Sequence, residues 1–232
     1  MEAKAPAPPP LCPTGLSEDP PRAAQDEGIR AFERQEYTQA QAFFGDLAHR
    51  YPGSAAARVW LGDSVLFDKG REDRAAAEAA RPIYAEAARL HQAGCKLQRR
   101  PRYYLLMGQA YAALRLAKLQ SGYEPTELDQ ADQALTAAAA EFPTSAEVPY
   151  NQARVACARV QQGAPGGLGP CLTSFERALV LAQSLDRPRF LRTHRSTQDW
   201  IVRSRNQSEF GPLRSDPAYR TLIDRTLAGE PG

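Results

Sequence analysis

The chain has 232 residues, of which 43% are hydrophobic and 24% charged, and its formal net charge is +2. This composition is typical of a globular protein with one or two domains, not of a disordered chain. It also excludes a membrane-spanning protein, because no apolar run approaches the roughly 20 residues that a membrane helix needs, and the near-neutral charge gives no general attraction to nucleic acid.

Residues 1–20 are rich in proline and contain almost no large apolar side chains. Such a segment cannot offset its ordering entropy by burial, so we expect a flexible tail, although a Pro-rich stretch can also dock into a groove that binds polyproline II helices. It has no apolar core of a secretory signal peptide. We therefore expect a cytoplasmic protein with reduced thiols at its four cysteines, Cys12, Cys95, Cys157 and Cys171.

From Ala23 onward the chain is rich in Ala, Leu, Gln and Arg, which favour helix. Apolar residues recur at spacings of three and four, and alternating runs of β-branched residues do not occur. The sequence therefore predicts an all-α fold.

Residues 21–54 follow a pattern of small, aromatic and proline residues at fixed positions, carried by Gly28, Ala40, Phe44 and Pro52. Two small residues allow a pair of helices to approach closely, an aromatic residue packs the second helix onto the first, and the proline ends the hairpin. This segment resembles the 34-residue tetratricopeptide repeat, or TPR.

Three more hairpins resemble the same repeat and are predicted to begin near Trp60, Tyr104 and Ala146, each with extra residues between its two helices. Pro82 lies inside the second helix of one hairpin, where we expect a kink or a restart of the helix. Residues 121–125 and 163–170 are predicted loops, and Thr126 is a predicted N-cap.

The last part of the chain is expected to cap the repeats. Residues 197–205 are predicted to be helical, and Ser215 or Asp216 should cap a final helix with Pro217 at its first position. The apolar stripe of that helix comprises Tyr219, Leu222, Ile223 and Leu227. The predicted organisation is a tail at 1–20, repeats at 21–185 and a helical cap at 186–232.

The TPR resemblance implies a right-handed superhelical solenoid of about four hairpins, as in many bacterial TPR proteins, that acts as a scaffold or adaptor. Its concave groove would bind a peptide or helix of another protein. The groove positions of the repeat fall on Ile29, Val59, Trp60, Asp63, Phe67, Arg102, Leu106 and Gln109.

No catalytic motif, phosphate-binding loop or metal-ligand spacing occurs in the sequence, so we expect no enzyme activity, no cofactor and no small-molecule substrate. An alternative function uses the Arg-rich C-terminal region, Arg187, Arg189, Arg192, Arg195, Arg203 and Arg205. In that alternative the chain would be a regulatory or accessory subunit that binds an acidic protein or nucleic acid through these arginines.

Overall fold

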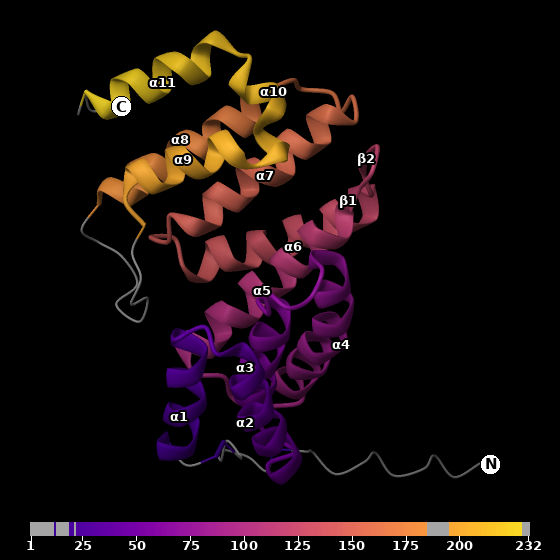
Figure 1. Cartoon of the computed structure of the whole chain (residues 1–232). Coiled ribbons are helices and arrows are strands. Elements are labelled where there is room, and N and C mark those ends of the chain that lie inside the picture. The colour runs from indigo at the N-terminus through magenta and orange to yellow at the C-terminus, as the bar shows by residue number, and fades with distance from the viewer. Residues whose placement is uncertain (1–11, 13–18, 21, 185–194, 229–232) are drawn as a thin grey trace, which may run out of the picture. The chain divides into compact units, whose positions relative to one another are not determined.

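The computed structural model describes residue 12 and residues 19–20, 22–184 and 195–228. Apart from one short hairpin, all regular structure in these residues is helical (Figure 1), so the all-α prediction is confirmed. The chain forms two compact units, Met1–Gly108 and Gln109–Gly232, whose boundary falls inside helix α5 (Arg99–Ala117). The sequence predicted no boundary at this position.

Unit 1 is built from consecutive antiparallel helices and the first half of α5. Helix α1 packs against α2, α2 against α3, and α3 against α4. Their bounds are α1 (Arg22–Glu33), α2 (Tyr37–Arg50), α3 (Ala55–Leu66) and α4 (Asp73–Gln92).

Two hairpins of unit 1 close through the same contact between a glycine and an aromatic ring. An added Cβ at Gly28 of α1 would lie 2.7 Å from the ring of Phe44 on α2, and one at Gly62 of α3 would lie 2.7 Å from the ring of Tyr84 on α4. Both distances are shorter than van der Waals contact allows, so only glycine lets these helices approach so closely. The predicted pairing of a small residue with an aromatic one is thus realised twice.

Two local features bear on the predicted helices of unit 1, a cap and an internal proline. Ser54 caps α3, because its Oγ accepts a hydrogen bond from Ala57 N at 3.1 Å. Pro82 lies within α4, which runs without interruption from Asp73 to Gln92, so the predicted restart does not occur. Pro82 is exposed on α4.

Unit 2 begins with the rest of α5 and continues through a short antiparallel hairpin, in which Lys118 pairs with Tyr123. Helix α6 packs against α7, α7 against α8, and α8 contacts both α9 and α11. The bounds are β1 (Lys118–Leu119), β2 (Gly122–Tyr123), α6 (Pro125–Glu141), α7 (Glu147–Gln161), α8 (Gly169–Gln183), α9 (Thr197–Asn206), η1 (Ser208–Phe210), α10 (Gly211–Arg214) and α11 (Pro217–Leu227).

The predicted starts of α9 and α11 are confirmed, whereas the helices predicted near Trp60 and Tyr104 begin earlier, at Ala55 and Arg99, and the predicted cap of α6 is wrong. Asp216 caps α11 by accepting from Ala218 N at 2.7 Å, and Pro217 follows at the first helical position. Helix α9 agrees with its predicted range. Thr126, however, is not an N-cap, because the side chain of Glu124 takes that role and accepts from the Thr126 N–H.

The core of unit 2 is an aromatic cluster in which Tyr150 contacts Phe175, Trp200 and Phe210, with ring centroids 4.4–6.2 Å apart. Tyr219, Leu222 and Ile223 of α11 pack into the same core. Leu227, the fourth member of the predicted stripe, is instead 55% exposed, because it lies at the end of α11.

The prediction of reduced thiols is wrong for all four cysteines. Cys12 is bonded to Cys95 and Cys157 to Cys171, with Cα–Cα separations of 5.3 and 5.2 Å that suit disulfides. Cys157 and Cys171 are fully buried, as expected of core residues, and their bond links α7 to α8 across the Gly-rich connection. The spacing of the four cysteines along the sequence does not indicate either disulfide.

Candidate functional site

Several residues predicted to line a groove lie inside the structure instead. Val59, Trp60, Asp63 and Leu106 are each at most 4% exposed. Trp60 is enclosed by other aromatic rings, and the Asp63 carboxylate accepts a hydrogen bond from the Tyr84 hydroxyl at 2.5 Å. As the chain is folded here, these four residues support the helices and do not present a binding surface.

A chain of ring contacts crosses unit 1 from α3 to α5. Phe67 contacts Phe32 with centroids 6.3 Å apart, Phe32 contacts Trp60 at 5.6 Å, and Trp60 contacts Tyr104 at 4.9 Å. We call these four residues the aromatic row. Trp60 is its buried centre, whereas Phe67, Phe32 and Tyr104 are half-buried, so the row reaches solvent at both ends and on α1.

Charged side chains cover the middle of the aromatic row. The guanidinium of Arg100 lies 4.9 Å from the centroid of Trp60 and 5.6 Å from that of Tyr104. The same guanidinium forms a 3.1 Å ion pair with Glu33 of α1. An ion pair therefore joins α1 to α5 above the Trp60 ring. The Arg100 cation is also stabilised by its attraction to the aromatic face of that ring.

Of the other predicted groove residues, Ile29, Phe67 and Arg102 are half-buried in unit 1, and Ile29 packs against the cluster that contains Trp60. Gln109 is half-buried and belongs to unit 2. The structure thus brings Ile29 and Phe67 to the aromatic row. Arg100, whose guanidinium lies over the Trp60 ring, is not among the predicted groove residues. The only sequence signal for its position is its spacing of four residues from Tyr104, which puts the two side chains on one face of α5.

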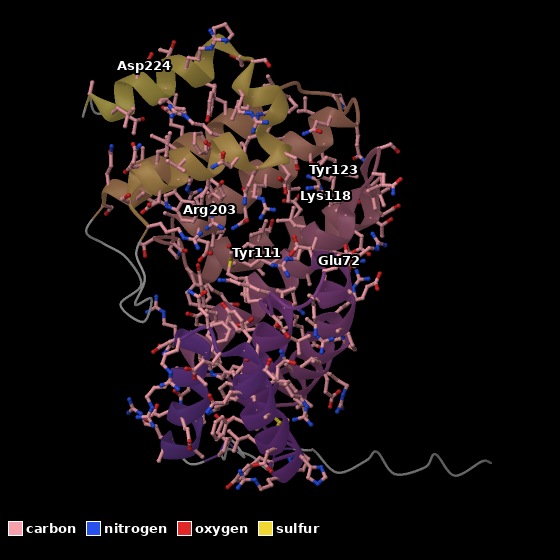
Figure 2. The ribbon with its side chains drawn as sticks, viewed as in Figure 1. Glu72, Tyr111, Lys118, Tyr123, Arg203 and Asp224 are labelled. Atoms are coloured by element: carbon pink, nitrogen blue, oxygen red, sulfur yellow. A yellow bond between two sulfur atoms is a disulfide. The ribbon has the colours of Figure 1, made fainter. Side chains whose placement is uncertain are left out.

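The Arg-rich C-terminal region divides into two parts. Arg187, Arg189 and Arg192 lie outside the described residues. Arg195 and Arg203 place their guanidiniums 5.2 and 5.8 Å from the Trp200 centroid, which ties them to the core of unit 2. Figure 2 marks Arg203 among the side chains of this unit.

Unit 2 also contains a buried polar network. Arg154 of α7 forms a 2.6 Å ion pair with Glu209 of η1, and the two side chains are only 12% and 6% exposed. Burial acts to raise the pKa of Glu209, but the charge and hydrogen bond of Arg154 outweigh it and hold that pKa below its ordinary value. The pair joins α7 to the C-terminal segment and is a structural contact.

Two tyrosine hydroxyls of unit 2 also donate to side chains. The Tyr111 hydroxyl donates to Glu147, and burial followed by the Glu147 charge raises the pKa of Tyr111 well above the usual range. Tyr150 donates to Gln207 Oε1 at 2.8 Å, and burial is the main cause of its raised pKa. Both hydroxyls therefore stay protonated at neutral pH and act as hydrogen-bond donors.

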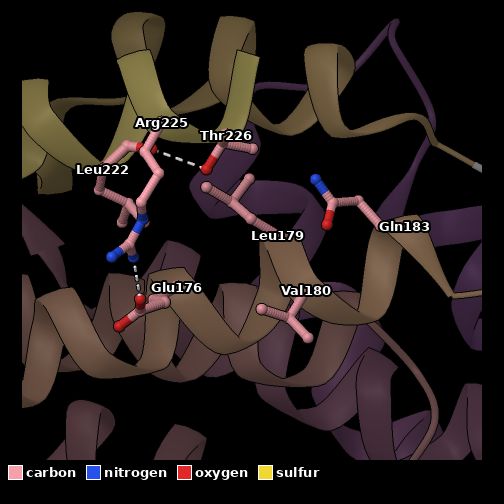
Figure 3. A pocket seen from close by; sticks show the side chains of 7 residues that line it. All are labelled: Glu176, Leu179, Val180, Gln183, Leu222, Arg225 and Thr226. Atoms are coloured by element: carbon pink, nitrogen blue, oxygen red, sulfur yellow. Dashed lines mark hydrogen bonds and ion pairs between the residues drawn. The ribbon is translucent and has the colours of Figure 1, made fainter. Parts of the chain in front are cut away.

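One small cavity between α8 and α11 holds no ligand-sized space. Figure 3 shows Arg225 of α11 reaching Glu176 of α8, an ion pair of 2.5 Å, beside Leu179 and Leu222. The cavity volume is about 10 Å³, roughly the space that a single water molecule needs. Its residues hold α11 against α8.

Comparison with known proteins gives no relative for this chain: no family model matches it, and neither does any curated protein or solved structure. The TPR resemblance therefore stays a prediction. Within the described ranges, no three His, Cys, Asp or Glu side chains gather as a metal site. None of the helices described is long and apolar enough to cross a bilayer.

Proposed function

We propose that the chain is a protein-interaction module, a TPR-like solenoid in which unit 1 binds a segment of a partner protein along the aromatic row. The observation that carries this proposal is the row itself, whose half-buried ends at Phe67 and Tyr104 flank the Arg100–Glu33 ion pair. Aromatic side chains beside arginine are the residues that most often dominate binding energy at protein interfaces.

The chemistry of the row defines the partner segment. Ile29, Phe32 and Phe67 offer apolar surface, and the Arg100 side chain, which is 22% exposed, adds a cation with N–H groups beyond the one that pairs with Glu33. An acidic side chain beside an apolar anchor would satisfy both features. We therefore infer a partner segment with an apolar residue next to a glutamate or aspartate, bound without any catalytic step.

The disulfides change the proposed compartment. Paired cysteines persist in oxidising compartments and are rare in the cytosol. Because all four cysteines are paired, we propose that the protein acts in an oxidising environment, in place of the cytoplasm expected from the sequence.

The test uses a photo-crosslinking amino acid placed at Ile29 or Phe67 of the full chain, with Val180 of α8 as a control position that is 51% exposed and lies in unit 2. We expect one protein to crosslink from positions 29 and 67 and not from 180. A synthetic peptide covering the crosslinked site should then bind the purified chain.

Two variants decide the assignment. Ile29→Gln and Phe67→Gln should each weaken that peptide about tenfold, while circular dichroism shows unchanged helix, because loss of a half-buried apolar contact costs on the order of 1–2 kcal/mol. Equal crosslinking from all three positions, or a peptide affinity that neither variant changes, would refute binding at the aromatic row. The accessory-subunit alternative would instead be supported if a crosslink formed only when the same amino acid was placed at Arg203 or Arg205.

A further inference from the structure

A second surface of the chain, in unit 2, carries an open cavity of about 320 Å³ between α9, α10 and α11. This volume lies at the lower end of the range for small-ligand pockets. Its lining is Arg205, Arg214, Tyr219, Arg220, Ile223 and Asp224. Asp224 is labelled on α11 in Figure 2.

The cavity has an excess of positive charge that its own walls do not neutralise. Three arginines face one aspartate, so two positive charges are in excess. Within the described part of the chain, neither Arg205 nor Arg220 forms an ion pair or a hydrogen bond through its side chain. Both guanidiniums therefore have their donors available to a ligand.

The third arginine is held in a fixed position. Arg214 Nη1 donates to the carbonyl oxygens of Gln207 at 2.7 Å and of Ser204 at 3.1 Å. These bonds fix one nitrogen of the guanidinium, whose other N–H groups can donate to a ligand. The position of this charge is thus set before any ligand arrives, which lowers the entropy cost of binding.

The stability of its own helix explains why an arginine stands at position 205, but it does not explain the arginine at position 220. Arg205 stands in the last turn of α9, where a cation is favourable beside the carbonyl end of the helix. Arg220 stands near the start of α11, where the N–H end of the helix repels a cation. Arg220 therefore adds charge to the cavity at a place where it weakens its own helix.

The floor of the cavity is apolar and rigid. Tyr219 and Ile223 line it and are each only 4% exposed. The Tyr219 hydroxyl is fixed by a 2.7 Å hydrogen bond with Ser204 Oγ. An apolar floor beneath an arginine rim suits a ligand that joins an anionic group to an apolar stem.

We propose that this cavity binds a phosphate monoester on an apolar stem. At neutral pH a phosphate monoester carries a charge close to −2, which matches the two excess positive charges, and arginines pair with phosphate oxygens through two parallel hydrogen bonds. The stem would lie on Tyr219 and Ile223. This site is independent of the aromatic row of unit 1, because it shares no residue with it.

The experiment is calorimetric titration of the full chain with phenyl phosphate at low salt. Phenol and inorganic phosphate serve as comparison ligands that carry the stem or the charge alone. We expect saturable binding of phenyl phosphate, at least tenfold weaker binding of each comparison ligand, and weaker binding as salt screens the charges. No saturable binding at millimolar concentration, or equally tight binding of phenol, would overturn the proposal.

Matched variants locate the site. Arg205→Gln and Arg220→Gln remove exposed side chains, so they should shift the melting temperature only slightly, downward for Arg205 and upward for Arg220, while each weakens phenyl phosphate binding about ten- to hundredfold. Arg177→Gln makes the same charge change on the exposed surface of α8, outside the cavity lining, and should not alter binding. Equal weakening by all three variants would show a general charge effect and overturn the site.

A final comparison of two ligands distinguishes a phosphorylated protein from a small molecule as the natural source of the phosphate. A short peptide that carries phosphotyrosine should bind more tightly than phenyl phosphate if the natural ligand is a phosphorylated protein, and no more tightly if it is a small molecule. Failure of the peptide to bind at all would contradict an open cavity.

Discussion

The Tyr84 hydroxyl donates a 2.5 Å hydrogen bond to Asp63 Oδ1 inside unit 1, where both residues are 1% exposed. The same tyrosine ring lies against Gly62 of α3 and Gly108 of α5. One side chain of α4 therefore positions two neighbouring helices and donates a hydrogen bond to a buried carboxylate.

Removing that hydroxyl should destabilise unit 1. Tyr84→Phe keeps the ring in place but leaves Asp63 without this donor, at a cost of about 1–3 kcal/mol in the free energy of unfolding. Urea denaturation followed by circular dichroism measures it. Tyr37→Phe is the matched control, since the Tyr37 hydroxyl has no hydrogen bond within the described residues. Equal losses from the two variants would contradict the importance of the bond.

Gly62→Ala should also be destabilising, by about 1–3 kcal/mol, because its new methyl group meets the Tyr84 ring at 2.7 Å. Gly45→Ala offers an opposite control. Nothing lies within 4 Å of a Cβ at that position of α2, so alanine should stabilise the helix by about 0.5–1 kcal/mol. Thermal melts of both variants test the pair, and a stabilised Gly62→Ala protein would refute the close approach of α3 and α4.

All four cysteines should resist alkylation in the unreduced, denatured protein. Mass spectrometry with iodoacetamide should show no added groups before reduction and four after it. The double variant Cys157→Ala, Cys171→Ala should lose about 3 kcal/mol, as expected for a loop of about 15 residues. Alkylation of Cys157 or Cys171 without a reductant would exclude the bond, and with it the argument for an oxidising compartment.

Acid should weaken unit 2 through Glu209. Because its pKa in the folded chain lies below the ordinary value of 4.5, its ion pair stabilises the fold above that pH and loses this effect as pH falls through the lowered pKa. Glu209→Gln should cost about 3 kcal/mol at pH 7, since it leaves the Arg154 charge buried without a counter-ion. The variant should also show a flatter pH dependence below 4.5. Parallel stability curves for the two proteins would contradict this role.

The helical hairpins could be predicted from sequence because their signals are local. Gly28 and Phe44 lie 16 positions apart, and the periodic apolar residues between them favour two helices that must meet. The cap at Asp216 and the proline after it are likewise read from adjacent residues. Such short-range patterns carry most of the information on helix position.

The site could not be predicted in the same way. A repeat position assigns Trp60 to a groove, but its large ring gains more by packing between Phe32, Phe44 and Tyr104, and that choice depends on neighbouring helices. Glu33 and Arg100 are 67 residues apart, and no local pattern links them. Cys12 and Cys95 are 83 residues apart, so no local pattern links them either.

The bond between Cys12 and Cys95 closes a covalent ring that contains α1, α2, α3 and α4. A pulling force applied to the two ends of the oxidised chain would pass from Cys12 directly to Cys95. The four helices would then carry no tension, and they would extend only after a reductant had opened the ring. Helices α1 to α4 are thus mechanically shielded by a single pair of sulfur atoms, whereas α5 lies outside the ring.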